Sequence, residues 1–544
     1  MPFFAIFLST ASHISSFARP TGNVSSSRFV YIESENPRAP VNETPFDIAP
    51  NFDVGSRDLG VRDVSQVSFM ANFGRPLWWA MLHGSSRFDE LGALGFDLLD
   101  LARRKLIGDR DPNETALPNT IAALAVVDVR LCLDHDSCRA QTRDVLDEMT
   151  RKHMRILYSM PQHREYYQSG YPSEPILAEA AAMQLDHWRN QTNRTVLIDT
   201  LLSFVQNTHL NVGDRAEVVG RALLTEAYDR AIIAEHPALS EARFSQGCLL
   251  TSFIRELLTE EAALAVLESQ PDNVPDGATF GNAFKDARVR FTHFTKLDDE
   301  ESLITAMLFV AFIRGMAFVA SSDEAFIDVV IPVSLRDEKL GESVMTGILI
   351  QFKRWGHART AAKVEIDAER LGFFPSTHES HPRPYCALIM QLKVHPPKGV
   401  IPGGQEKGVL GEQRAEPSTP RENAPGLVSK VKRRLESLRS TERDATHPRY
   451  HFSVYGCSNT VYKGILEEEN RKYAALLSSG NTFHDHGRQT EEQLAEVWRM
   501  KPSWSAAMGS YHWVEGADII SNVLDEGDGV VISQYPGYEG ENSG

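Results

Sequence analysis

The chain has 544 residues, of which 42% are hydrophobic and 24% charged, values that exclude a disordered or fibrous protein and allow two to four domains. Its formal net charge of −17 excludes a protein coated with positive charge for nucleic acid, so a nucleic-acid enzyme would need a local basic surface. Five scattered cysteines and the lack of any membrane-length apolar stretch predict an intracellular protein of the cytoplasm or nucleus, with no membrane partner.

The first half of the chain is predicted to be mainly helical. Pro2–Leu8 is apolar and lacks a preceding basic residue, so we interpret it as a buried strand and not as a secretion signal. A helix is predicted to open at Ser173-Glu174-Pro175, with Ser173 as its cap and Pro175 in its first turn. Helical spacing of apolar residues marks seven further segments: Pro76–Leu82, Leu91–Leu106, Leu117–Leu133, Arg139–Ser159, Val196–Gln206, Gly213–Ile233 and Phe244–Glu268.

A region in which helices alternate with strands follows. A strand is predicted at Asp286–Phe294, beside a core with the order helix, three strands, helix, strand. The elements of that core are Asp298–Arg314, Gly315–Ala320, Ala325–Val333, Met345–Lys353, Ala358–Leu371 and Tyr385–Val394. The fold class that this order predicts is α/β, with α+β as the alternative.

The second and third strands of this core are predicted to form a hairpin. If the hairpin folds about its midpoint near Lys339, Asp328 lies opposite Gln351. Side chains alternate along a strand, so Lys353 then shares a face with Asp328 and Gln351, while Ile350 and Phe352 face the core. A carboxylate, an amide and an ammonium group thus converge on one spot of an otherwise apolar hairpin.

This arrangement resembles the PD-(D/E)XK nuclease superfamily, in its variant with Gln in place of the acid. The resemblance implies that Asp328 binds a divalent metal, that Gln351 helps to coordinate it, and that Lys353 orients or activates water. Glu301, on the preceding helix, is expected to add a ligand. The implied cofactor is Mg²⁺, which prefers such oxygen ligands, and the implied activity is a magnesium-dependent nucleic-acid phosphodiesterase.

A second hypothesis is a catalytically silent binding or effector module that keeps the nuclease-like fold. The triplet alone says little, because Gln-x-Lys recurs at 391–393 and 405–407 and a buried Asp–Lys pair would look the same. Only the register with Asp328 is informative. A nuclease would also need a basic surface for nucleic acid, which Lys353, Arg354, His357, Arg359 and Lys363 could supply.

Other segments carry a second resemblance. Phe3–Ser9 followed by His13-Ile14-Ser15, and then Phe73-Gly74-Arg75-Pro76-Leu77-Trp78, resemble the distal part of ATPase domains. Such domains accompany nuclease-like domains in Crinkler effectors and in an expanded, uncharacterised family of mushroom-forming fungi, which Ser169-Gly170-Tyr171-Pro172-Ser173-Glu174-Pro175 also resembles. No Gly-x4-Gly-Lys-Ser/Thr loop occurs, so we expect neither ATP binding nor ATPase activity, and a relative that is degenerate or truncated at its N-terminus. Arg75 is either a remnant phosphate sensor or a structural residue beside a helix start.

The predicted domain organisation has five parts. They are a helical remnant of an ATPase-like module at 1–210, the nuclease-like core at 211–395, a disordered insert at 396–449, a C-terminal extension packing on the core at 450–525, and a flexible acidic tail at 526–544. A zinc site at Cys132, His135 and Cys138, or at His484-Asp485-His486, is disfavoured because each pattern lacks a second ligand cluster or a strand. The oligomeric state and protein partners are left open.

Overall fold

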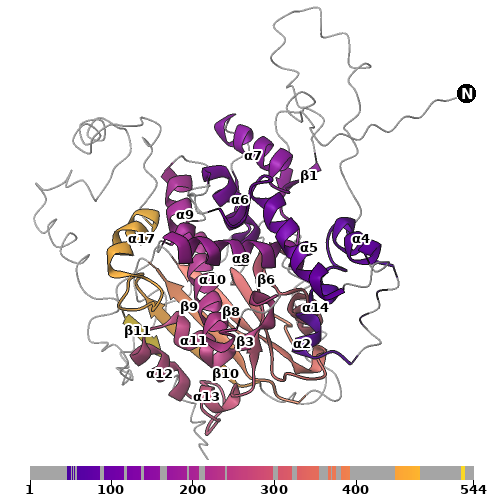
Figure 1. Cartoon of the computed structure of the whole chain (residues 1–544). Helices are drawn as coiled ribbons and strands as arrows, with labels where there is room; N and C mark the ends of the chain where they lie inside the picture. Colours follow the sequence, from indigo (N-terminus) through magenta and orange to yellow (C-terminus); the bar gives the residue numbers. More distant parts are fainter. Residues whose placement is uncertain are drawn as a thin grey trace, which may run out of the picture.

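Figure 1 shows the computed structural model of the chain, seen with its helical half above a mixed sheet. The residues that the structure describes are 46–50, 52, 54, 58–85, 91–114, 119–135, 140–159, 168–192, 195–206, 215–238, 242–297, 304–320, 327–353, 366–368, 371–374, 381–392, 447–477 and 529–532. The predicted strand at Pro2–Leu8, Glu301, and most of the predicted insert at 396–449 lie outside these ranges.

Helices dominate the first half, as predicted. They are α2 (Val61–Val64), α3 (Val67–Met70), α4 (Pro76–Ser85), α5 (Leu91–Leu106), α6 (Thr120–Leu131), α7 (Ala140–Lys152), α8 (Pro175–Thr192), α9 (Val196–Gln206) and α10 (Arg215–Glu235). Further helices are α11 (Leu250–Leu257), α12 (Glu260–Glu268), α13 (Phe280–Ala283), α14 (Thr305–Arg314) and α17 (Asn470–Leu477). The helix after Ser173-Glu174 begins at Pro175, but the Ser173 hydroxyl contacts His293 Nε2 at 2.8 Å and so takes part in a tertiary contact.

The strands of the second half form one mixed sheet. Its members are β3 (Cys248–Leu249), β4 (Arg288–Val289), β5 (His293–Lys296), β6 (Met316–Val319), β7 (Val329–Ser334), β8 (Met345–Lys353), β9 (Tyr385–Gln391), β10 (Arg449–Tyr455) and β11 (Gly529–Ile532). Its main path runs β11-β10-β9-β8-β7-β4-β3, while β6 pairs with both β5 and β7. A separate two-stranded hairpin joins β1 (Ile156–Ser159) to β2 (Gln168–Gly170). The α/β class is confirmed.

Strand directions in the centre of the sheet follow the chain order of the predicted core. Helix α14 leads directly into β6, which is antiparallel to β7, and β7 is antiparallel to β8. Strand β9 then returns parallel to β8. A parallel return needs a crossover connection rather than a tight turn. The connecting segment, where we predicted a helix at Ala358–Leu371, is described only at 366–368 and 371, and these residues are not helical.

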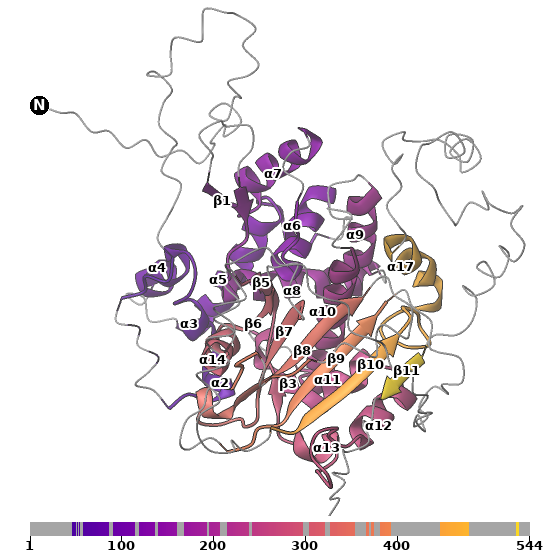
Figure 2. The same ribbon diagram turned by 180° about the vertical axis from the view of Figure 1, so that it is seen from behind.

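Two hydrophobic cores cover the two faces of the sheet. On one face, Ile348, Ile350 and Phe352 of β8 belong to a core that also contains residues of α5, α6, α8, α9 and α10. On the other face, Val330 and Leu349 pack with α14. Helices α10 and α11 therefore lie in front of the sheet in Figure 1 and behind it in Figure 2. The first core contains residues from both sides of the boundary predicted at 210, between the helical part and the nuclease-like core. The division of the chain into domains stays a prediction.

Helix α10 approaches β8 closely because it carries a glycine at the contact. A Cβ added at Gly220 would lie 2.1 Å from a ring carbon of Phe352, a distance that real atoms do not reach. Only a residue without a side chain lets the two backbones come so near. The contact fixes the position of the next residue, Arg221, relative to the end of β8.

Several predicted boundaries are wrong. Phe244–Glu268 is not one helix, because Gly247 adopts a positive φ of 73° and Leu258 is extended, which separates a short strand, α11 and α12. The predicted helix at Arg139–Ser159 ends at Lys152, and Ile156–Ser159 instead forms β1. The predicted strand at Asp286–Phe294 is two short strands, β4 and β5.

The C-terminal part differs from its prediction at one place. Gly529–Ile532, which we predicted as part of a flexible tail, pairs antiparallel with β10 at the edge of the sheet. Its Val530-Val531-Ile532 sequence is β-branched, a composition that suits a strand. In the described part of the chain no helix combines the length and the apolar character needed to cross a membrane.

Candidate functional site

The hairpin has the register that the sequence predicts. Val329 of β7 pairs with Ile350 of β8, and the Asp328 backbone N–H donates to the Ile350 carbonyl at 2.9 Å. The pairing of β7 with β8 therefore has the predicted register, and it ends at Val329, because Asp328 precedes the first residue of β7. The position of Asp328 opposite Gln351 is the next step of this register and stays a prediction. Ile350 and Phe352 are buried on the α10 face. By alternation, Gln351 and Lys353 lie on the other side of β8. Asp328 precedes β7, and its carboxylate bonds the Phe352 backbone N–H between the two strands, so a face shared with Gln351 and Lys353 stays a prediction.

The Asp328 carboxylate is held across the end of β8. Its Oδ2 accepts a hydrogen bond from the Phe352 backbone N–H at 2.5 Å. Burial raises the pKa of Asp328 to about 6, an effect that the Phe352 N–H and the charges of Arg221 and Lys353 partly oppose. Burial also lowers the pKa of Lys353, against the attraction of Asp328. We call Asp328, Gln351 and Lys353, together with Arg221 on the α10 side of β8, the sheet-end corner. Arg221 belongs to it because its charge acts on Asp328.

Two members of the sheet-end corner keep unused hydrogen-bonding atoms. Gln351 Oε1 is buried and contacts no donor among the described residues. Arg221 is fully buried, and its Nη1 donates to the Cys132 carbonyl at 3.2 Å, while its Nε and Nη2 have no partner in the described part of the chain. Buried polar groups are normally paired, because leaving one unpaired costs about 1–3 kcal/mol. The corner is therefore incomplete as a structural network.

Sequence reasoning missed Arg221. The signal was present, because Arg221 interrupts the apolar run Val218-Val219-Gly220-Arg221-Ala222-Leu223-Leu224 in the middle of α10. A charged residue within an otherwise apolar buried helix is unusual unless it is paired. Nothing in the sequence, however, indicated that α10 would cross the end of β8.

The corner offers two oxygen donors of the kind that Mg²⁺ uses, the carboxylate of Asp328 and the side-chain amide of Gln351. Mg²⁺ is commonly bound through one or two carboxylates and keeps several of its waters. Asp328 supplies one carboxylate, and the unpartnered Gln351 Oε1 is a neutral oxygen of the preferred kind. The predicted third ligand, Glu301, lies outside the described residues. Within the described ranges, no group of three or more His, Cys, Asp or Glu residues could hold a metal.

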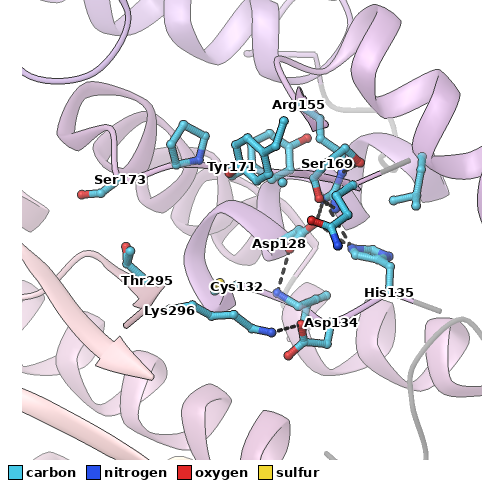
Figure 3. Close-up of a pocket in the computed structure, with 16 residues that line it drawn as sticks. Asp128, Cys132, Asp134, His135, Arg155, Ser169, Tyr171, Ser173, Thr295 and Lys296 are labelled. Carbon is cyan, nitrogen blue, oxygen red and sulfur yellow. Dashed lines mark hydrogen bonds and ion pairs between the residues drawn. The ribbon is translucent and has the colours of Figure 1, made fainter. Parts of the chain in front are cut away.

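A second polar region lies beside the corner, around a cavity of about 650 Å³ (Figure 3). The residues that line it come from the end of α6, the β1–β2 hairpin, the segment before α8 and the end of β5. They include Asp128, Cys132, Asp134, His135, Arg155, Tyr158, Ser169, Tyr171, Ser173, Thr295 and Lys296. Leu146 of α7 lines the cavity as well, and no motif in the sequence indicates that these segments meet.

The charges of the cavity wall form two pairs. Asp128 accepts hydrogen bonds from the Leu133 backbone N–H and from His135 Nε2, each at 2.8 Å, and from Arg155. Burial lowers the pKa of His135, so the imidazole is neutral near pH 7. Lys296 forms an ion pair with Asp134. Two wall atoms, His135 Nδ1 and Thr295 Oγ1, are buried without a partner among the described residues.

Arg75 has the structural role rather than the phosphate-sensing one. Its guanidinium forms a two-point ion pair with the fully buried Glu174 carboxylate, with Nε–Oε2 at 2.7 Å and Nη2–Oε1 at 2.5 Å. Its Nη2 also donates a hydrogen bond to the Met154 carbonyl. Trp78 Nε1 donates to the same carboxylate at 2.8 Å. The segments 73–78 and 169–175, which both carry the second resemblance, therefore bind each other.

The remaining predictions of metal or basic residues fall on residues that the structure does not describe. Cys138, the segment His484–His486, and the basic residues Arg354, His357, Arg359 and Lys363 all lie outside the described ranges. Lys353 is described and lies at the end of β8.

Comparison with known proteins gives one match. A family model described as a domain of unknown function (DUF8736) matches residues 116–394, about half of the chain. The matched range contains both the sheet-end corner and the cavity beside it. No curated protein matches the chain, and no solved structure matches it.

Proposed function

The chain belongs to the family of the domain of unknown function DUF8736, and we propose that the sheet-end corner of this domain is the active site of a magnesium-dependent nucleic-acid phosphodiesterase. The observation that supports the proposal is the register of the hairpin, which brings Asp328, at the start of β7, beside the end of β8 that carries Gln351 and Lys353. The order α14, β6, β7, β8, β9, with β9 parallel to β8, supports it, because it matches the first helix and the four strands expected of a PD-(D/E)XK-like core. The helix expected between β8 and β9 falls on a segment described only at 366–368 and 371, and these residues are not helical.

Each side chain of the corner has a role in this proposal. Asp328 and Gln351 would hold Mg²⁺, which when bound lowers the pKa of a coordinated water and neutralises charge on a phosphate oxygen. The Lys353 ammonium orients the water or stabilises the charge that builds up on the phosphate. The water oxygen bonds to phosphorus while the bond from phosphorus to one sugar oxygen breaks. The water loses a proton to solvent, and the leaving oxygen takes one up.

A catalytically silent binding or effector module is the second candidate, and two observations favour it. Gln351 is an amide where the superfamily resemblance expects an acid, and one oxygen of Asp328 is already engaged by the Phe352 N–H. A Gln351→Glu variant separates the two candidates. If the wild type is inactive, cleavage gained by this variant identifies a degenerate active site, whereas continued inactivity supports the silent module.

The test is cleavage of labelled single- and double-stranded DNA and RNA by the full chain, with Mg²⁺ or with EDTA. We expect Mg²⁺-dependent cleavage that Lys353→Ala abolishes while the fold stays intact by circular dichroism. Lys285→Ala is the matched control, because the Lys285 side chain is 72% exposed and lies outside the corner. Cleavage that continues in EDTA, or that is equal in wild type and Lys353→Ala, would contradict the proposal.

A further inference from the structure

The cavity beside the sheet-end corner is built like a binding site and not like a packing gap. Its volume of about 650 Å³ lies within the range of small-molecule sites, roughly 300–1,000 Å³. Packing gaps in protein interiors are smaller than this and mostly apolar. This cavity is lined by charged, hydroxyl and aromatic side chains that converge from several segments (Figure 3).

The charge of the wall excludes a strongly charged group deep in the cavity. Asp128 is paired with Arg155, and Asp134 is paired with Lys296, so the wall carries as many negative as positive charges. His135 adds an imidazole whose Nε2 is used by Asp128. What the wall offers instead is hydrogen bonding, because His135 Nδ1 and Thr295 Oγ1 are buried without a partner in the described structure. A flat polar ligand that both donates and accepts hydrogen bonds fits these two atoms.

Aromatic surface is present at the same wall. The Tyr158 side chain is 47% exposed although it lines the cavity, and its ring lies against the backbone of Gly170, where an added Cβ would be 2.8 Å from a ring carbon. Tyr171 is fixed by a hydrogen bond from its hydroxyl to the His153 carbonyl at 2.7 Å and by the Arg155 guanidinium, 5.5 Å from its ring centre. Exposed tyrosine rings held in place are surfaces on which nucleobases stack.

Positive charge lies behind the wall on the side of the sheet-end corner. Arg221 donates to the carbonyl of Cys132, a residue of the cavity wall, and its charge also acts on Asp328. Two of its nitrogen atoms have no hydrogen-bond partner among the described residues, and no ion pair to Arg221 is formed within them. An unneutralised charge in a low-dielectric interior acts over a longer distance than one in water. It attracts an anion to the space between the cavity and Asp328.

The strand register shows that the cavity and Asp328 are near each other. Lys296, at the cavity, pairs with Val319 of β6, and Val319 pairs with Val329 of β7, which follows Asp328 directly. Neighbouring strands lie about 4.8 Å apart, so two strand steps amount to roughly 10 Å. A nucleic-acid strand that continues past the cavity can therefore place a phosphodiester at the corner.

From these observations we infer that the cavity binds one unstacked nucleotide, with its base against Tyr158 and hydrogen-bonded to Thr295 and His135, and its phosphate drawn toward Arg221. The inference deepens the proposed function and rests on it, because it makes single-stranded nucleic acid the substrate class of the sheet-end corner. A nucleotide unit could come from a strand or from a free nucleotide, and the experiment separates these two sources.

Binding is measured by fluorescence anisotropy on the full chain in EDTA, so that no cleavage is needed for a signal. The probes are short labelled single-stranded DNA and RNA oligonucleotides and a duplex of the same sequence, with AMP as an unlabelled competitor. We expect single strands to bind more tightly than the duplex, because a paired base is not free to stack. Displacement of the oligonucleotide by AMP would identify the free nucleotide as the ligand, and variant-sensitive binding without displacement would identify the strand.

Two variants test the wall directly. Tyr158→Ala should weaken oligonucleotide binding about tenfold, since stacking on one aromatic ring is worth about 1–3 kcal/mol per base. Tyr158→Phe keeps the ring and should bind as the wild type does. Thr295→Val should weaken binding several-fold without lowering the unfolding midpoint, because the Thr295 hydroxyl has no partner in the described protein to lose. A purely structural threonine would show the opposite pattern.

The outcomes distinguish this inference from the proposed function. Unchanged binding in both Tyr158→Ala and Thr295→Val, or no binding of any probe, would overturn the role of the cavity even if Mg²⁺-dependent cleavage occurs. Binding that depends on these residues, with no cleavage under any condition, would leave the cavity as a nucleotide site and remove the phosphodiesterase. Lys353→Ala should lose cleavage and keep binding.

Discussion

Two fully buried arginines lie in opposite surroundings, and the difference separates the region that holds the fold from the region that we assign to function. Arg290, directly after β4, donates to three carbonyls, those of Ser245 at 2.7 Å, Phe312 at 2.6 Å and Val64 at 2.8 Å. Arg221, on α10, donates to one carbonyl and leaves two nitrogen atoms unpaired within the described structure.

The comparison extends to the neighbours of each arginine. Around His293, whose pKa the charges of Arg130 and Arg290 both affect, Arg130 makes two contacts with the Asp229 carboxylate. Glu174, next to the Ser173 that contacts His293, accepts from Arg75 and Trp78. At the end of β8, Gln351 Oε1 is unpartnered among the described atoms. Saturated buried networks make a fold rigid, whereas unsaturated ones are kept where a ligand completes them. Substitutions in the two regions should therefore differ in their cost to stability.

The largest effect is expected for Arg290→Met. The substitution leaves the Ser245 and Val64 carbonyls, on segments far apart in the sequence, without their donor, while the Phe312 carbonyl keeps the Gly315 N–H. An unpaired buried group costs about 1–3 kcal/mol, so the free energy of unfolding should fall by about 3 kcal/mol or more. Urea unfolding followed by circular dichroism measures it. A loss of unfolding free energy below about 1 kcal/mol would contradict a stabilising role for these hydrogen bonds.

Acid should weaken the same saturated region through His293. Burial, together with the nearby charges of Arg314, Arg130 and Arg290, lowers the pKa of His293 to about 3. The unfolded chain takes up a proton near pH 6.5 and the folded protein does not, so stability falls as the pH drops from 6.5 toward 3. By pH 4 this one group should remove on the order of 3 kcal/mol.

His293→Gln tests the acid prediction, because glutamine does not titrate and can still bond the Ser173 hydroxyl. The variant should be less stable than the wild type at pH 7, since packing is disturbed, but its unfolding midpoint should change less between pH 7 and pH 4.5. Parallel pH profiles for the two proteins would remove His293 as a source of acid sensitivity.

The smallest effect is expected for Arg221→Met, the matched counterpart of Arg290→Met. The variant loses one hydrogen bond to the Cys132 carbonyl but also removes a buried charge that the protein does not satisfy. Replacing a poorly paired buried charge by an apolar side chain is often neutral or stabilising, so the free energy of unfolding should change by less than about 1 kcal/mol. A loss as large as that of Arg290→Met would end the distinction between the two regions.

The sequence was informative where local rules decide the structure. The boundaries of α5 and β8 agree with the helical spacing and the alternation of their residues. The register of β7 with β8 could be predicted because one-residue slips would turn the apolar face of the hairpin to solvent. Breaks at Gly247 and Leu258 were missed because the apolar period continues through them, although the backbone does not.

The cavity and Arg221 could not be predicted for a different reason. Asp128, Ser169 and Thr295 meet only through tertiary packing, and no spacing along the chain connects them. The unpaired state of Arg221 depends on which groups fail to reach it, and that requires the three-dimensional structure. The alternation of apolar residues was therefore enough to predict the hairpin at Asp328, whereas the residues around it are known only from the three-dimensional structure.

Mg²⁺ binding tests the central claim about the sheet-end corner most directly. Isothermal titration of Mg²⁺ into the full chain is compared with the same titration into Asp328→Asn, whose amide oxygen can still accept from the Phe352 N–H and so preserves the fold. We predict saturable binding to the wild type and affinity at least about tenfold weaker in the variant, a difference of about 1.4 kcal/mol, at an unchanged unfolding midpoint. Equal Mg²⁺ affinity in the two proteins would contradict the assignment of the corner as a metal-dependent active site.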